Sequence, residues 1–163
     1  MLMGVSVSAS KPHRDDVPAI QQRNLPLLLL QARECVLARF RPLLNANGMT
    51  EQQWRVIRGL LDTGPLEPRE IVMRCAISSP SLAGVLARME DLGLVRRERL
   101  AHDQRRVKVS LTDKSRKLAA RMAPEVEATY AALEAQLGKV FVHSMYAMLD
   151  DLIARLGPAD PGD

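Results

Sequence analysis

The residues best suited to specific chemistry are small hydroxyl side chains followed closely by arginines. Ser78, Ser79 and Ser81 lie at the start of a predicted helix, which Ser78 or Ser79 caps and where Pro80 occupies the first turn. Serine hydroxyls at a helix N-terminus can donate hydrogen bonds to phosphates or base edges. Arg88 lies seven residues after Ser81, on the same helix face, and suits a phosphate or a guanine. This face favours binding to a polyanion over catalysis.

A basic cluster follows this helix within thirteen positions, made of Arg96, Arg97, Arg99, Arg105, Arg106 and Lys108. Two antiparallel strands would bring these side chains together on a protruding hairpin. Arg105, directly after the predicted turn, is best placed to enter a narrow minor groove. Asp103 would repel a phosphate, so we expect it to hold the neighbouring arginine through a bidentate ion pair. A charge run on a hairpin is often only a solvated face, and it is the combination with the serine-bearing helix that favours DNA binding.

The composition predicts a helical protein. The chain has 163 residues, 47% of them hydrophobic but only 3% aromatic, so aliphatic side chains and methionine must form the core. The net charge of +4 favours an anionic partner. Cys35 and Cys75 are far apart and fit no metal-binding or disulfide pattern, so we expect no metal and no cofactor.

The N-terminal segment, residues 1–23, lacks periodicity and is predicted to be a flexible arm. It has no basic region followed by a long apolar stretch, unlike a secretory signal peptide. No apolar run reaches the roughly 18 residues of a membrane-spanning helix. We therefore expect a cytoplasmic protein that has no membrane partner.

Helical spacing of apolar residues begins after Asn24, the predicted cap of a first helix that Pro42 and residues 47–48 should end. Thr50 and Gln53 form a capping box for a second helix. Its predicted buried residues are Trp54, Val56, Ile57, Leu60 and Leu61.

The second half of the chain is predicted as two helices, a ribbon and two more helices. A short helix spans residues 68–75, and the next runs from the serines to Gly93 with Leu82, Val85, Leu86 and Met89 facing the core. Residues 94–100 and 105–111 alternate as strands do. Thr112 caps a long helix that Pro124 should bend, and a last helix follows Gly138.

This order predicts a mainly α protein with a small β-wing, a winged helix-turn-helix. The third and fourth helices form the helix-turn-helix, and the fourth would lie in the DNA major groove.

The wing sequence DQRRVKVSLT (103–112) resembles the signature of MarR-type transcriptional regulators, and LARMEDLGLVRR before it resembles the end of their recognition helix. The stretches LLLLQARE, FRP, TEQQWRVIR and PSLAGVLARME are similar to the branch that represses homoprotocatechuate catabolic operons. The resemblance covers residues 25–156 and excludes the N-terminal arm. It implies a domain over 24–157, in which intertwined helices (24–48 and 112–157) form a homodimer around a DNA-binding lobe (50–111).

The resemblance also implies partners and site residues. A two-fold dimer reads a double-stranded, pseudo-palindromic operator whose half-sites are about 34 Å apart. The implied major-groove residues are Ser78, Ser79, Ser81, Leu82 and Arg88, with Arg105 in the minor groove beside Asp103 and Arg106. A small aromatic carboxylate, either homoprotocatechuate-like or pyridine-carboxylate-like, would bind between dimerisation helices and lobe. Its candidate contacts are Arg33, Met49, Gln52, Trp54 and Arg55.

Other interpretations stay open. Trp54 is also a typical core residue, and Arg55 is equally suited to cap or bridge helices. A repressor of the same fold could sense oxidants through Cys35, since Arg33 and Arg39 would favour its thiolate. A nonspecific nucleoid protein would bind DNA without regard to sequence. An enzyme is disfavoured, because His13, His102 and His143 are scattered and no nucleophile–base constellation is present.

Overall fold

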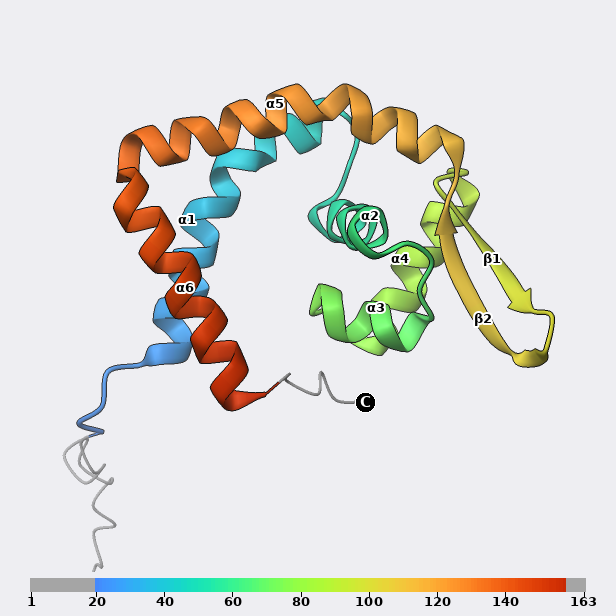
Figure 1. The fold of residues 1–163 in the computed structure, drawn as a ribbon, viewed down its shortest axis with the longest axis horizontal. Coiled ribbons are helices and arrows are strands. Elements are labelled where there is room, and N and C mark those ends of the chain that lie inside the picture. Colours follow the sequence, from blue (N-terminus) through green and yellow to red (C-terminus); the bar gives the residue numbers. More distant parts are fainter. Residues whose placement is uncertain (1–19, 158–163) are drawn as a thin grey trace, which may run out of the picture.

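The computed structural model describes residues 20–157 (Figure 1). Residues 1–19 of the predicted arm lie outside the described residues, and residues 20–23 carry no helix or strand. Within the described part, the fold consists of six helices and one antiparallel strand pair. The elements are α1 (Leu25–Ala46), α2 (Glu51–Thr63), α3 (Pro68–Cys75), α4 (Ser79–Asp91), β1 (Val95–Leu100), β2 (Asp103–Leu111), α5 (Asp113–Leu137) and α6 (Lys139–Leu156).

The helices divide into a long frame and a small lobe. Figure 1 shows α5 running across the molecule, with α1 beneath it and α6 descending from its far end. The lobe of α2, α3 and α4 lies under the other part of α5, and the β1–β2 hairpin projects at the end opposite α6. This arrangement confirms the predicted winged helix-turn-helix.

Local capping fixes the predicted helix starts. Oδ1 of Asn24 accepts the N–H of Leu27 at 3.0 Å at the start of α1. At α2, Thr50 and Gln53 form both hydrogen bonds of the capping box, at 3.0 and 3.2 Å. The Thr112 hydroxyl accepts the N–H of Ser115 at 3.3 Å at α5. Each cap satisfies backbone donors that the first helical turn leaves free, so these starts follow from local sequence.

The predicted end of the first helix at residues 47–48 is confirmed, since Asn47 is the C-cap of α1, but the prediction that Pro42 contributes to this end is wrong. Pro42 lies inside α1, which continues to Ala46. Proline costs the helix one hydrogen bond, but Leu43 and Leu44 directly after it are buried in the core and hold the last turn in place. The hairpin also differs slightly, because β2 begins at Asp103, two residues earlier than expected.

The core is formed by the lobe and the adjoining part of α5. Its fully buried side chains include Val56 and Ile57 of α2, Ile71 of α3, Leu86 and Met89 of α4, Val109 of β2 and Met122 of α5. Two predicted core residues are more exposed than expected, because the buried face of α2 is centred on Gln53, Val56, Ile57 and Leu60. Trp54 is half-buried and Leu61 is 40% exposed.

None of the described helices has the length and apolar character to cross a membrane alone, and only α3 with α4, taken as one pair bent by 110°, meets that test of length and composition.

Candidate nucleic-acid interface and effector cavity

The N-terminal end of α4 presents hydroxyl groups on the surface of the lobe. Ser78 is the N-cap of this helix, and its Oγ donates to Oγ of Ser81 at 2.9 Å. Ser79, Ser81 and Arg88 are exposed, as predicted. A Cβ placed on Gly84 would meet nothing within 4 Å, so this glycine lies on open surface that a second molecule can approach closely. This face therefore has the small polar residues that groove binding requires.

Leu82 is a correction to the predicted DNA-contacting set. Its side chain is 2% exposed and belongs to the core with Leu86 and Met89. Residues 82, 86 and 89 share one face of α4, which packs inward. Leu82 thus packs α4 against the core, and its side chain is not available on the surface.

Asp103 supports the wing in a different way from the predicted one. Its Oδ1 accepts the backbone N–H of Arg105 at 3.0 Å, and within residues 20–157 it forms no ion pair with an arginine side chain. Short side chains of this type commonly close turns on their own backbone. The side chain of Arg105 is exposed, so Asp103 fixes the backbone from which it projects.

Arg106 is engaged within the lobe. Its Nε donates to Oε1 of Glu67 at 2.8 Å, and its Nη2 reaches the same oxygen. The hydrogen bond with Glu67 raises the pKa of Arg106 above its usual value. Next to this pair, Leu66 and Val109 exchange backbone hydrogen bonds of 3.1 and 2.7 Å. The loop before α3 therefore anchors the wing, which favours a positioning role for Arg106.

Ion pairs neutralise part of the wing. Arg96 pairs with Glu98, and Arg97 pairs with Glu90 of α4, at 3.1 and 2.8 Å. Arg99, Arg105 and Lys108 form no ion pair within the described part of the chain, so they supply its uncompensated positive charge.

We expect Glu67→Gln to lower the ratio of specific to nonspecific DNA affinity about threefold. The wing keeps Arg105 in this variant but loses the ion pair between Arg106 and Glu67 that anchors it. Glu98→Gln is the matched control, because it removes one negative charge from β1 and leaves the Arg106–Glu67 ion pair intact. Fluorescence anisotropy with operator and scrambled duplexes measures both ratios. Equal ratios in the two variants would mean that the Arg106–Glu67 ion pair has no part in recognition.

The five predicted effector contacts do not line one cavity. Arg33 and Arg55 both pair with Glu51, and Met49 is buried in the core. Gln52 lines a hollow of about 270 Å³ beside Ser81 and Arg88 of α4. Of the five, Trp54 alone lines the cavity between α2 and α5.

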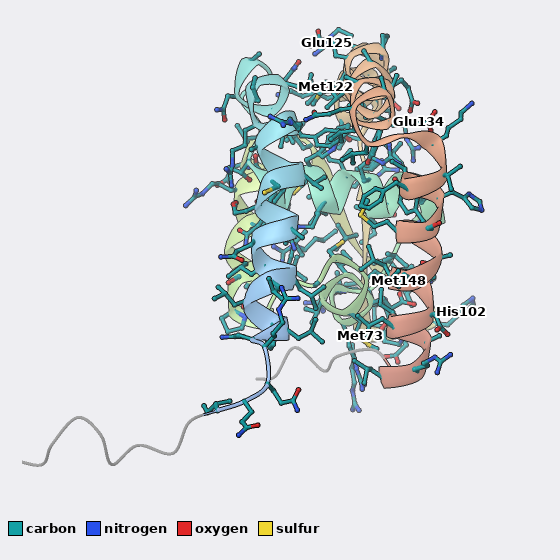
Figure 2. All side chains as sticks on the ribbon, turned by 90° about the vertical axis from the view of Figure 1, so that its left-hand side faces the viewer. Met73, His102, Met122, Glu125, Glu134 and Met148 are labelled. Carbon is teal, nitrogen blue, oxygen red and sulfur yellow. The ribbon has the colours of Figure 1, made fainter. Side chains whose placement is uncertain are left out.

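That cavity has a volume of about 270 Å³. Three residues of α2 form one wall: Trp54, Arg58 and Leu61. The opposite wall comes from α5 and consists of Arg116, Ala119, Ala120, Ala123, Val126 and Glu127. Figure 2 labels Met122, which is 1% exposed, and Glu125, which is exposed, on the same stretch of α5.

Arg58 is a functional candidate that sequence reasoning missed. It lies one helical turn after Trp54, and this four-residue spacing was the available signal. Tyr130 lies nearby: burial raises the pKa of its hydroxyl, and the charge of Arg58 opposes that rise. The Tyr130 ring packs edge-on against Phe40 with centroids 4.9 Å apart. A guanidinium beside aromatic and small apolar side chains can bind a carboxylate while its ring packs against the wall.

The frame helices leave a large apolar surface uncovered in a single chain. No residue of α6 is buried, and Met148, labelled in Figure 2, is 70% exposed. Other large apolar side chains that are at least 37% exposed on α1 and α6 are Leu25, Leu27, Leu28, Leu29, Leu30, Val140, Phe141, Tyr146, Leu149, Ile153 and Leu156. Exposed apolar surface of this kind marks an interaction site.

The two cysteines differ in accessibility. Cys35 is exposed on α1, whereas Cys75 is buried and its Sγ donates to the carbonyl of Arg55 at 3.5 Å. Burial raises the pKa of the Cys75 thiol, so it is the less reactive of the two.

Fold and surface together define a winged helix-turn-helix DNA-binding protein. Its sequence matches the MarR family over residues 47–106. It is 41% identical over 128 residues to the HTH-type transcriptional regulator FarR of Neisseria gonorrhoeae, covering 78% of this chain and 85% of that protein. The chain belongs to the MarR family, and it is a transcriptional regulator rather than an enzyme.

The names of two further relatives mention aromatic acids. The homoprotocatechuate degradative operon repressor of Escherichia coli is 37% identical over 131 residues, covering 80% of this chain and 88% of that protein. The crystal structure of NadR in complex with 4-hydroxyphenylacetate is similar with a TM-score of 0.72 at 38% identity, covering 86% of this chain and 96% of that one.

Proposed function

We propose that this protein is a homodimeric, sequence-specific transcriptional repressor that a small aromatic acid releases from a pseudo-palindromic operator. The observation that carries the proposal is the cavity between α2 and α5, where Arg58 and Trp54 face an alanine-rich wall. Names of two relatives support the ligand class: one represses a homoprotocatechuate operon, and the other was crystallised with 4-hydroxyphenylacetate. Homoprotocatechuate-like and pyridine-carboxylate-like acids share a ring and a carboxylate, the two groups that this cavity can bind.

The position of the cavity gives the acid a way to act on DNA binding. Trp54 and Arg58 belong to the lobe, whereas the facing alanines belong to α5 of the frame. Arg58 would pair with the carboxylate, and Trp54 would pack against the ring. An acid that prefers one spacing of lobe and frame shifts the population toward it. Where that spacing does not fit the operator, the affinity for DNA falls. By thermodynamic linkage, bound DNA then lowers the affinity for the acid by the same factor.

On the operator, the lobe (50–111) would make contacts of two kinds. Ser78, Ser79, Ser81 and Arg88 would enter the major groove with α4, and Arg105 would enter the minor groove. Helices within 24–48 and 112–157 would pair two chains, which sets half-sites about 34 Å apart.

Dimerisation through the exposed apolar residues of α1 and α6 can be tested with Phe141→Ala. Phe141 is 57% exposed in the single chain, and burial of its ring in a dimer implies about a tenfold rise in the dissociation constant on truncation. Sedimentation equilibrium measures this constant. Arg155→Ala on the same helix is the control, since among residues 20–157 Arg155 pairs with Asp151, one turn away on α6. Equal constants for the two variants would remove this face of α6 from the proposed interface.

The proposal as a whole is tested by fluorescence anisotropy on the intergenic DNA beside the protein's own gene. The protein is titrated at fixed salt, and then hydroxylated benzoates, phenylacetates and pyridine carboxylates are added. Tight, sequence-dependent binding that one acid reverses supports the proposal. Binding that scrambled DNA matches would indicate a nonspecific DNA-binding protein. Specific binding that no acid reverses but peroxide does would point to Cys35, and loss of the peroxide response in Cys35→Ser would establish that role.

A further inference from the structure

A chain of polar contacts joins helix α1 to the turn between α3 and α4. Arg33 of α1 forms an ion pair with Glu51 in the first turn of α2. The same carboxylate oxygen, Oε1, accepts Nη2 of Arg55 at 3.0 Å. Nη1 of Arg55 then donates to the backbone carbonyls of Cys75 at 2.8 Å and Ala76 at 3.1 Å.

The last of these polar contacts, from Arg55, reaches a strained part of the backbone. Ala76 has a φ of 47°, and among the described residues it is the one non-glycine with positive φ. Such a conformation persists where surrounding contacts enforce it. Arg55 supplies two of these contacts, and its cation also interacts favourably with the carbonyl end of α3. Because α4 begins three residues after Ala76, at Ser79, Arg55 helps to set the direction of the recognition helix.

Glu51 is the central residue in this series of polar contacts. Two guanidinium groups approach its single carboxylate oxygen, and Nε of Arg55 is buried without a hydrogen-bond partner within residues 20–157. Burial lowers the pKa of Arg55, and the charge of Arg33 lowers it further. Without the Glu51 carboxylate, the two cations would face each other across the boundary between α1 and the lobe.

We propose that Arg33, Glu51 and Arg55 transmit the position of α1 to the helix-turn-helix turn, so that they set how strongly DNA binding responds to the effector. They are positioning residues and do not line the cavity that holds Trp54 and Arg58. This inference rests on the proposed function, in which α1 belongs to the dimer frame and the lobe reads DNA. In this proposal, a change in the spacing of lobe and frame reaches α4 through the contacts of these three residues.

Amide hydrogen exchange on the full-length dimer tests the link without DNA or effector. The probes are the N–H groups of Ala76 and Ile77, which both donate to the carbonyl of Val72. Arg33→Gln is expected to speed their exchange about threefold to fivefold, although Arg33 does not touch the turn. Glu34→Gln is the matched control, because Glu34 is the next residue and pairs with Arg41 within α1. Unchanged exchange at the turn in Arg33→Gln would overturn the proposal.

A second experiment tests whether the link carries regulation, with 4-hydroxyphenylacetate as the probe. Operator affinity is measured with and without the acid, and calorimetry gives the affinity of the acid for the free dimer. Glu51→Gln is expected to reduce the ratio of the two operator affinities at least threefold, with acid affinity unchanged within twofold. A preserved ratio with weakened acid binding would make Glu51 part of the ligand site and contradict the proposal. If the acid does not affect wild-type DNA binding, the proposed effector class fails, and the exchange experiment alone decides the link.

Discussion

Arg105→Ala is expected to lower operator affinity about 10- to 100-fold while the protein stays folded. An arginine that pairs with a base edge or fills a narrow minor groove contributes roughly 1–3 kcal/mol of discrimination. Arg105 is exposed, and Asp103 fixes the backbone on which it stands. Its removal takes away no core contact, so thermal unfolding should not change. Fluorescence anisotropy at fixed salt, combined with sedimentation, measures affinity and assembly separately.

Arg99→Ala controls for charge, since it removes the same positive charge from the other strand of the wing. The general electrostatic loss should affect operator and scrambled DNA alike in this variant. In Arg105→Ala the loss should fall mainly on the operator and so reduce the specificity ratio. If both variants lost the same affinity on both duplexes, Arg105 would be only one of several phosphate-binding charges.

The outline of this fold could be predicted from local sequence because local interactions determine it. Caps at Asn24, Thr50 and Thr112 satisfy backbone groups within three residues of themselves, so they can be recognised without knowledge of the rest of the chain. The alternation through β2 and the spacing of Leu82, Leu86 and Met89 similarly place whole elements. For Leu82, helical periodicity gave the correct position, and family resemblance, which assigned the residue to the DNA surface, was wrong.

Contacts between distant segments could not be predicted in this way. Arg106 and Glu67 are 39 residues apart, and no local pattern distinguishes a wing arginine that binds a carboxylate from one that reaches DNA. Arg55 and Arg58 show the same limit on one helix. Both lie within a turn of Trp54. However, Arg55 contacts the end of α3, whereas Arg58 faces α5. The choice between them depends on which neighbour covers each side of α2, which only packing decides.

Arg58→Gln is expected to weaken binding of the acid about 10- to 100-fold while leaving operator affinity in its absence unchanged. A hydrogen bond to a charged group contributes about 1.5–3 kcal/mol, and glutamine keeps much of the shape of arginine without its charge or fork geometry. Arg58 is exposed on the cavity side of α2, away from the serines of α4, so the DNA surface stays intact. Isothermal calorimetry with 4-hydroxyphenylacetate, followed by anisotropy on the operator, separates the two effects.

Arg116→Gln is the informative companion, because Arg116 lines the same cavity from α5. If Arg58 binds the carboxylate, loss of Arg116 should weaken the acid only slightly, through the weaker local potential. If the carboxylate points toward α5 instead, the order of the two variants reverses while the cavity assignment holds. Should both variants bind the acid like the wild type and still release DNA, the effector would bind elsewhere on the protein. In that case the proposed DNA binding, which is argued from α4 and the wing, would still hold, and only the assignment of the effector to the cavity between α2 and α5 would be wrong.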